Sequence, residues 1–336
     1  MKIGNFETDE EVMVVAEIGN NHEGSYARAE EMIGLAAEAG ASAVKFQTIH
    51  PEHLVRTQDE ARFAMLKDFE LSYDEFEKLS QVARDEQVIF LSTPFDLKSA
   101  EFLNGLVPAF KIASGDNTFY PLLEKIAEFG KPIMLSTGLV GMKQLAYSKS
   151  LIEKVWADKG IQQDIALLHC VCSYPTPPSN ANLSSILFLR ENFGGTIGYS
   201  DHTLGIEAAV ISVALGARII EKHFTLDRNF SDFNDHKLSV DPTLLKELVS
   251  RIGEVNDLIG YPEKQVQDCE IENRMACRRS IAAGRNIAAD QILLWEDLVW
   301  LRPGGGLSPG REHDLIGKKA LREIRAGEHI LPGDVS

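Results

Sequence analysis

The chain has 336 residues, of which 44% are hydrophobic, so it can bury a large core and exceeds the roughly 250 residues of a single barrel domain. Its formal net charge of −16 argues against nucleic acid or an anionic membrane as a partner. No apolar run approaches the roughly twenty residues that cross a bilayer, and no leader-like segment precedes the first apolar run, so we expect a cytoplasmic protein.

Eight short apolar runs predict strands along most of the chain. Segments with helical spacing separate them, for example residues 27–39, 73–85 and 122–129. Buried strands that alternate with helices predict a parallel sheet, and eight of them predict a closed (β/α)8 TIM barrel. An open, doubly wound sheet is the competing topology. The runs are residues 12–19, 43–48, 88–95, 109–115, 132–138, 165–171, 196–202 and 217–223.

Polar residues end most of these runs, at the edge where a parallel barrel places its active site. Residues i and i+2 of a strand point the same way, so Glu221 shares a face with His223 and Ser200 shares one with His202. Gathering lysines and carboxylates in one cavity is unfavourable unless they pair or meet a charged ligand. A structural ion pair formed by Lys111 and Glu221 is the alternative explanation. If the shared faces point inward, one cavity receives Glu17, Lys45, Gln47, Lys111, Ser136, Ser200, His202 and His223.

Two histidines end neighbouring predicted strands, and their imidazoles can share one divalent ion while coordination positions stay open. His202 and His223 are therefore the candidate metal ligands, ahead of His22, His169 and His236.

Lysines at the same edge indicate an anionic ligand. Lys45 and Lys111 would neutralise phosphate or carboxylate oxygens, and Ser114, Ser136 and Ser200 would add neutral donors. The sequence thus predicts a locally cationic pocket inside an acidic protein.

A series of short motifs accompanies these strand ends. In order they are V-A-E-I-G-N-N-H-E-G at 15–24, V-K-F-Q at 44–47, L-S-T-P-F at 91–95, K-I-A-S-G at 111–115, L-S-T-G at 135–138, Y-P-T-P at 174–177, S-D-H-T at 200–203 and E-K-H-F-T at 221–225. Together they resemble the sialic acid synthase family, which comprises N-acetylneuraminate synthase and the related legionaminate and pseudaminate synthases. The resemblance runs nearly from end to end.

A different pattern begins near residue 260. Segments 287–298 and 324–335 each read I-x-A-x-x-x-[IL]-L-x-x-D-[LV], which predicts a small pseudo-symmetric domain. This part resembles the antifreeze-like (SAF) domain attached to the same synthases. We therefore expect a catalytic barrel, a linker and an SAF domain, over residues 1–262, 263–277 and 278–336 respectively.

The resemblance also implies a quaternary arrangement. In the family, the SAF domain caps the barrel of a partner subunit in a swapped homodimer. Arg302, in L-R-P-G-G-G at 301–306, matches the arginine that reaches the partner's site and binds the acceptor's N-acetyl oxygen. Without the resemblance, it would read as a solvated arginine before a turn.

The activity implied by the resemblance is condensation of phosphoenolpyruvate with N-acetylmannosamine or a related N-acetylated amino sugar, giving a nine-carbon nonulosonate and phosphate. A divalent cofactor, Mn²⁺ or Mg²⁺, would bind His202 and His223 and polarise the sugar aldehyde. Glu17 is the implied proton-transfer group. The resemblance implies that phosphoenolpyruvate is bound by Lys45, Lys111, Ser114, Ser136 and Ser200. It implies that the sugar is bound by Gln47, Thr93, Tyr174, Asp235 and Arg302. The implied catalytic residues are Glu17, Asp235, Lys45 and Lys111.

Two departures from the family pattern leave the acceptor open. Cys172 stands where N-acetylneuraminate synthases carry asparagine, and Asp116 where they often carry glutamate. Because a thiol cannot replace the donors and acceptor of an amide, a 2,4-diacetamido-2,4,6-trideoxyhexose, the legionaminate or pseudaminate type of acceptor, is the alternative. From other classes, a barrel metallohydrolase and a non-catalytic carbohydrate-binding scaffold remain as hypotheses.

Overall fold

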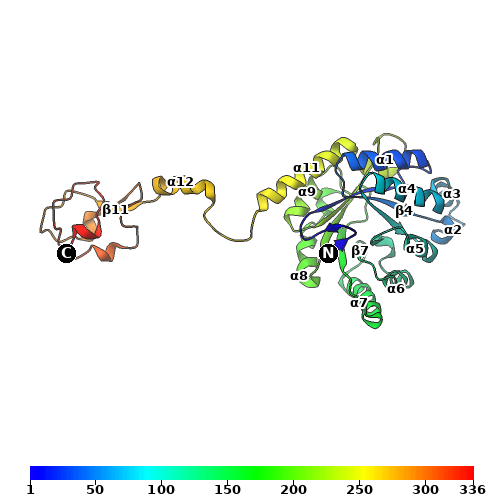
Figure 1. The fold of residues 1–336 in the computed structure, drawn as a ribbon, viewed down its shortest axis with the longest axis horizontal. Coiled ribbons are helices and arrows are strands. Elements are labelled where there is room, and N and C mark those ends of the chain that lie inside the picture. Colours follow the sequence, from blue (N-terminus) through cyan, green and yellow to red (C-terminus); the bar gives the residue numbers. More distant parts are fainter. The chain divides into compact units, whose positions relative to one another are not determined.

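The computed structural model describes residues 1–336 as two compact units, Met1–Gly260 and Tyr261–Ser336 (Figure 1). The first unit contains eight parallel strands, all of which fall within the runs predicted from the sequence. No helix of the chain combines the length and the apolar character that crossing a membrane requires. The parallel strands are β3 (Met13–Gly19), β4 (Ala43–Thr48), β5 (Ile89–Pro94), β6 (Phe110–Ile112), β7 (Ile133–Ser136), β8 (Ile165–Cys170), β9 (Ile197–Asp201) and β10 (Ile219–His223).

The sheet follows the strand order β5-β4-β3-β10-β9-β8-β7-β6, with parallel ladders between neighbours. The two end strands, β5 and β6, lie beside each other without ladder pairing, so the sheet curves round into a barrel. The end strands of an open, doubly wound sheet would lie far apart. The predicted (β/α)8 barrel is therefore confirmed.

Helices surround this barrel (Figure 1). The three helices predicted at 27–39, 73–85 and 122–129 correspond to α1, α4 and α6, with ends shifted by at most two residues. The helices are α1 (Tyr26–Glu38), α2 (Pro51–Leu54), α3 (Glu60–Phe69), α4 (Tyr73–Asp85), α5 (Leu97–Leu103), α6 (Tyr120–Glu128), α7 (Met142–Lys159), α8 (Ser184–Phe193), α9 (Glu207–Ala214), α10 (Asn234–Leu238) and α11 (Pro242–Ile259).

Successive side chains of each strand point alternately into the barrel and toward the surrounding helices, and this alternation decides which residues fill the barrel. On β3, Val14 and Ala16 belong to the core between the sheet and the helices, whereas Met13 and Val15 belong to a separate interior cluster. Glu17 is the next residue on the inward face, so a polar layer lies above an apolar floor. The floor consists of Met1 and Ile3 from the N-terminal hairpin (β1, Lys2–Ile3; β2, Phe6–Glu7) with Met13, Val15, Ala43, Leu91, Ala109, Met134, Ala166, Leu168 and Ile219.

The second unit begins with α12 (Asp268–Cys277), which lies in the segment predicted as a linker, and pairs β11 (Ser280–Ala283) with β12 (Leu298–Leu301). The repeated sequence pattern is also a structural repeat. Arg285 Nε donates to Asp297 Oδ1 at 2.5 Å, and Arg322 Nε donates to Asp334 Oδ1 at 2.7 Å. The two segments also pair directly, through a bridge between Ile287 and Ile324.

Candidate active site

A cavity of about 400 Å³ lies at the carboxyl ends of the barrel strands. Every barrel residue that the sequence analysis assigns to a site lines it, although the individual roles stay predictions. Arg302 lies in the second unit, exposed after β12, so its role and the swapped homodimer also stay predictions. The predicted residues that line the cavity are Glu17, Lys45, Gln47, Thr93, Lys111, Ser114, Ser136, Tyr174, Ser200, His202, His223 and Asp235.

Two buried lysines and two buried carboxylates form a cage in this cavity. Lys45 Nζ lies 2.6 Å from Glu17 Oε2 and 3.8 Å from Glu221 Oε2. Lys111 Nζ lies 3.2 Å from Glu221 Oε1, which also accepts a 2.9 Å hydrogen bond from Ser200 Oγ. The ion pair considered as a structural alternative therefore exists, and both of its members line the cavity.

The two carboxylates of the cage differ in protonation. Burial, opposed by Lys45, raises the pKa of Glu17 to about 7. Burial acts in the same direction on Glu221, but the charges of Lys111 and Lys45 outweigh it and lower its pKa to about 2. Near neutral pH the cage thus holds two lysines against one ionised carboxylate and a second that is partly protonated. Its positive excess favours an anionic ligand.

Two imidazoles converge beside the cage. The ring centroids of His202 and His223 are 5.2 Å apart, and burial lowers the pKa of both side chains, which favours the neutral form that binds metals. His202 Nδ1 lies 2.9 Å from the Val171 carbonyl oxygen, a contact that leaves Nε2 for another partner. His223 Nδ1 is buried without a hydrogen bond and lies 3.6 Å from Asp235 Oδ2.

These two imidazoles fit a divalent ion as a partial ligand set. No group of three or more His, Cys, Asp or Glu side chains is arranged to hold a metal. A catalytic site, unlike a closed structural one, also uses water and substrate as ligands. The unpaired Nδ1 of His223 is the observation that most favours a bound group here.

The part of the cavity wall that follows β6, β7 and β8 is closely packed. Ser136 Oγ is buried without a hydrogen-bond partner, so it is available to a ligand. A Cβ at Gly138 would lie 2.7 Å from Ser114 Oγ and 2.8 Å from Cys172 Sγ, so only glycine allows this close approach. Cys172 lines the cavity, whereas Asp116 is not among its lining residues.

Sequence reasoning left several lining residues unassigned. Glu221 is the common partner of both cage lysines, and its position two residues before His223 was the available signal. Arg62 comes from α3, where no strand-end pattern marks it. The same holds for most of the apolar lining residues, which are Ile49, Leu54, Met65, Leu66, Leu139 and Phe233.

A closed barrel whose mouth holds a cationic cage beside two neutral imidazoles defines an enzyme site for an anionic substrate. Residues 32–264 match the NeuB family, and residues 278–336 match the SAF domain. The chain therefore belongs to the NeuB family. The predicted family, the barrel followed by an SAF domain, and the synthase type of enzyme are confirmed.

Named relatives span nearly the whole chain. A Methanocaldococcus jannaschii protein of uncharacterized function is 44% identical over 327 residues, covering 97% of this chain and 95% of that protein. The N,N'-diacetyllegionaminic acid synthase of Campylobacter jejuni is 36% identical over 332 residues, covering 95% of this chain and 98% of that enzyme. The N-acetylneuraminic acid synthetase of Leptospira borgpetersenii superposes with a TM-score of 0.76 at 34% identity, covering 81% of this chain and 94% of that chain.

Proposed function

We propose that this protein condenses phosphoenolpyruvate with an N-acetylated amino sugar and water, giving a nonulosonate and phosphate. The observation that carries the proposal is the cage of Lys45 and Lys111 at the barrel mouth. Burying two lysines is unfavourable unless an anion shares the cavity, and one ionised carboxylate does not balance them. The two synthases reported above as similar to this chain are named for N,N'-diacetyllegionaminic acid and N-acetylneuraminic acid, which supports a product of this class.

In the proposed complex, the lysines bind the phosphate and carboxylate of phosphoenolpyruvate. An ammonium group donates up to three hydrogen bonds, so Lys45 and Lys111 can keep part of their contacts with Glu17 and Glu221 while they bind the anion. Ser136 Oγ, which has no partner in the chain, would gain one from the ligand. The cage therefore orients the substrate and neutralises its charge.

The reaction moves both protons of the attacking water to other oxygens. C3 of phosphoenolpyruvate forms a bond to the aldehyde carbon, and water adds at C2 while the aldehyde oxygen gains a proton. When the C2–O bond to phosphate breaks, the C2 hydroxyl becomes a carbonyl and its proton leaves with the phosphate. A group that is half-protonated near neutral pH can take the proton from the water and supply one to the aldehyde oxygen. Glu17, whose pKa burial raises to about 7, fits this task. A divalent ion held by His202 and His223 would supply Lewis-acid polarisation of the aldehyde.

The acceptor is proposed to be N-acetylmannosamine, with a 2,4-diacetamido-2,4,6-trideoxyhexose as the alternative. Cys172 lies against Ser114 and Gly138 in the cavity wall and offers no amide donor there. An apolar lining residue such as Met65 would accommodate the methyl group of a 6-deoxy sugar. Both features are compatible with the alternative acceptor.

A phosphate-release assay tests this function. We expect purified protein with Mn²⁺ and phosphoenolpyruvate to release phosphate only when an acceptor sugar is present. The three candidates are N-acetylmannosamine and the 2,4-diacetamido-2,4,6-trideoxyhexoses of the legionaminate and pseudaminate types. Each is supplied alone and then in pairwise competition, and the highest kcat/KM identifies the acceptor. Phosphate release without sugar, or hydrolysis of simple esters, would instead indicate a metallohydrolase, and binding of sugar without turnover would indicate a carbohydrate-binding scaffold.

The metal proposal predicts the outcome of removing both imidazoles. The double change His202→Ala and His223→Ala should abolish Mn²⁺ binding, measured by electron paramagnetic resonance, together with metal-dependent turnover. His169→Gln is the matched control, because His169 Nε2 contacts the Ala181 carbonyl oxygen at 2.7 Å and does not line the cavity. Undiminished Mn²⁺ binding by the double variant, or full turnover after exhaustive chelation, would contradict the assignment.

A further inference from the structure

A long loop connects β10 to α11 and delivers Asp235 to the cavity. Its two ends are joined, because Thr225 N donates to the Val240 carbonyl at 3.0 Å and Val240 N donates to the His223 carbonyl at 2.8 Å. Between these ends, α10 carries Asp235 in its first turn. The Asp235 carboxylate makes no hydrogen bond within the chain, so the backbone of α10 determines where it lies.

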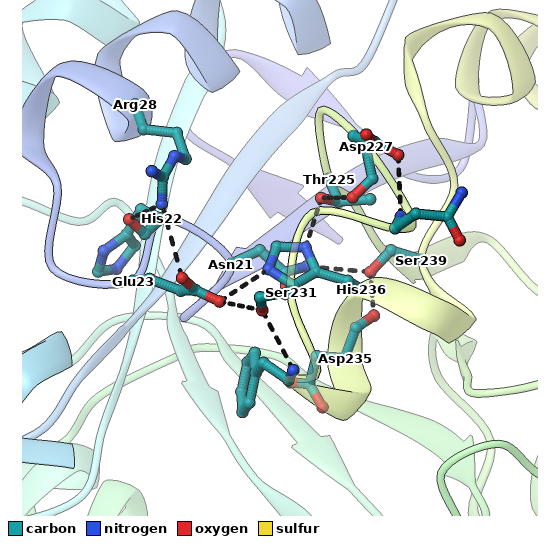
Figure 2. Close-up of polar contacts among 12 residues, drawn as sticks. Asn21, His22, Glu23, Arg28, Thr225, Asp227, Ser231, Asp235, His236 and Ser239 are labelled. Carbon is teal, nitrogen blue, oxygen red and sulfur yellow. Dashed lines mark hydrogen bonds and ion pairs between the residues drawn. The ribbon is translucent and has the colours of Figure 1, made fainter. Parts of the chain in front are cut away.

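A buried histidine next to Asp235 ties this loop to the turn that follows β3, the strand paired with β10 (Figure 2). His236 Nδ1 lies 2.6 Å from Thr225 Oγ1, and His236 Nε2 lies 3.2 Å from Glu23 Oε1. The same Glu23 oxygen accepts a hydrogen bond from Ser231 Oγ. Glu23 follows β3, so one carboxylate joins the turn after the first barrel strand to two positions of the loop.

Chemistry assigns each hydrogen of this bridge. An ionised Glu23 only accepts hydrogen bonds, so His236 must donate from Nε2. In the neutral imidazole, Nδ1 then accepts, and the Thr225 hydroxyl donates to it at 2.6 Å rather than to the more distant Asp227 carbonyl oxygen at 3.2 Å. Burial lowers the pKa of His236, which is consistent with the neutral ring. Both ring nitrogens are thereby satisfied in a side chain that is 1% exposed.

A second set of contacts, made by Ser239 and Asn21, holds the backbone of Asp235 itself (Figure 2). Ser239 Oγ donates to the Asp235 carbonyl oxygen at 2.5 Å. Asn21 Nδ2 donates to Ser239 Oγ at 3.0 Å and to the Phe224 carbonyl oxygen at 2.8 Å. Both flanks of α10 are therefore fastened to the segment that follows β3.

An arginine completes the attachment. Arg28 on α1 lies with its guanidinium carbon 4.0 Å from the centre of the Phe230 ring, and its Nη1 is 3.9 Å from Glu23 Oε2. Phe230 belongs to the loop and also packs on the His236 ring. Glu23 is thus held from one side by Arg28 and binds the loop with its other oxygen.

We infer that Glu23 and His236 are positioning residues: their buried contact clamps α10 and so fixes Asp235 beside His223 at the cavity mouth. The inference rests on the proposed function only in that Asp235 is taken to contact the acceptor. Neither Glu23 nor His236 lines the cavity, so neither touches the substrate directly. The clamp acts by keeping a carboxylate that has no hydrogen bond of its own within reach of the sugar.

Hydrogen exchange tests the clamp without relying on activity. In the full-length protein, Glu23→Ala and His236→Leu should each lower the protection of amides 225–240 by roughly tenfold or more, while the strands of the barrel stay protected. Asp227→Ala is the matched control, since its side chain lies in the same loop, contacts Asn229 N and takes no part in the bridge. Unchanged protection in both clamp variants would overturn the inference.

Kinetics with phosphoenolpyruvate, Mn²⁺ and N-acetylmannosamine test whether loss of the clamp impairs use of the acceptor sugar. Each clamp variant should lose roughly 10- to 100-fold in kcat with an acceptor KM that rises, while the KM for phosphoenolpyruvate changes less than about twofold. In an Asp235→Asn background the same changes should cost less than about threefold, because the group being positioned is gone. A full loss in that background, or equal effects on both substrates, would overturn the positioning role. If the wild-type protein turns over none of the candidate sugars, the proposed function fails, whereas the exchange experiment still decides on the clamp.

Discussion

Replacing Lys111 with methionine is expected to lower kcat/KM for phosphoenolpyruvate by on the order of 10³-fold or more. Lys111 is buried and is the nearest cation to Glu221, at 3.2 Å. Its loss removes charge-assisted hydrogen bonds to the substrate, each of about 1.5–3 kcal/mol, and leaves Glu221 with Lys45 at 3.8 Å as its remaining cation. The cage would then carry no positive excess, and an anion would be repelled from it.

The Lys111→Met experiment includes a variant that separates binding from folding. The single variant leaves the buried charge of Glu221 with only the more distant Lys45 as a partner and is thereby destabilised, so Lys111→Met combined with Glu221→Gln removes both charges and should recover thermal stability while staying inactive. Lys131→Met is the matched control: Lys131 precedes β7 at the opposite end of the barrel and binds the Asn104 and Val107 carbonyl oxygens. Titration calorimetry with phosphoenolpyruvate measures binding directly. Normal affinity in the stable double variant would contradict the anion cage.

Strand-end chemistry was readable from the sequence because it depends on short-range rules. The period of two along β10 places Glu221 and His223 on one face, and the same rule places Ser200 on β9 and His202, directly after it, on one side. Closure of the barrel then brings the ends of separate strands to one cavity without further information. The prediction of one shared pocket therefore needed only the strand positions and their parity.

Features that depend on loop paths were not readable in this way. The contact between Glu23 and His236 joins residues 213 positions apart in the chain, and the sequence pattern offers His236 only as a weaker metal candidate. The apolar lining residues come partly from α2 and α3, whose sequences carry no signal that they cover the mouth. The sequence pattern predicts Glu221 as one member of an ion pair, but its contact with both lysines depends on how the barrel closes.

The largest expected effect on stability comes from Lys222, on the outward face of β10. Its Nζ lies 2.9 Å from Asp201 Oδ2 and donates to the Thr203 carbonyl oxygen at 2.5 Å, and both charged side chains are fully buried. Burial lowers the pKa of Lys222, and the charge of Asp201 opposes this effect. Lys222→Met should therefore cost about 3–5 kcal/mol of unfolding free energy, because it leaves the Asp201 carboxylate buried without a cation.

Denaturant unfolding measures this loss, and a double variant identifies its cause. Adding Asp201→Asn to Lys222→Met removes the stranded charge and should recover more than half of the lost stability. A single variant that loses less than about 1 kcal/mol would contradict the argument. Because Lys222 lies between Glu221 and His223, and Asp201 between Ser200 and His202, the alternation that turns the active-site residues inward turns this pair outward. The pair thereby links the carboxyl ends of β9 and β10 on the outward face of the barrel, next to His202 and His223. Its loss should weaken Mn²⁺ binding even under conditions in which the variant remains folded.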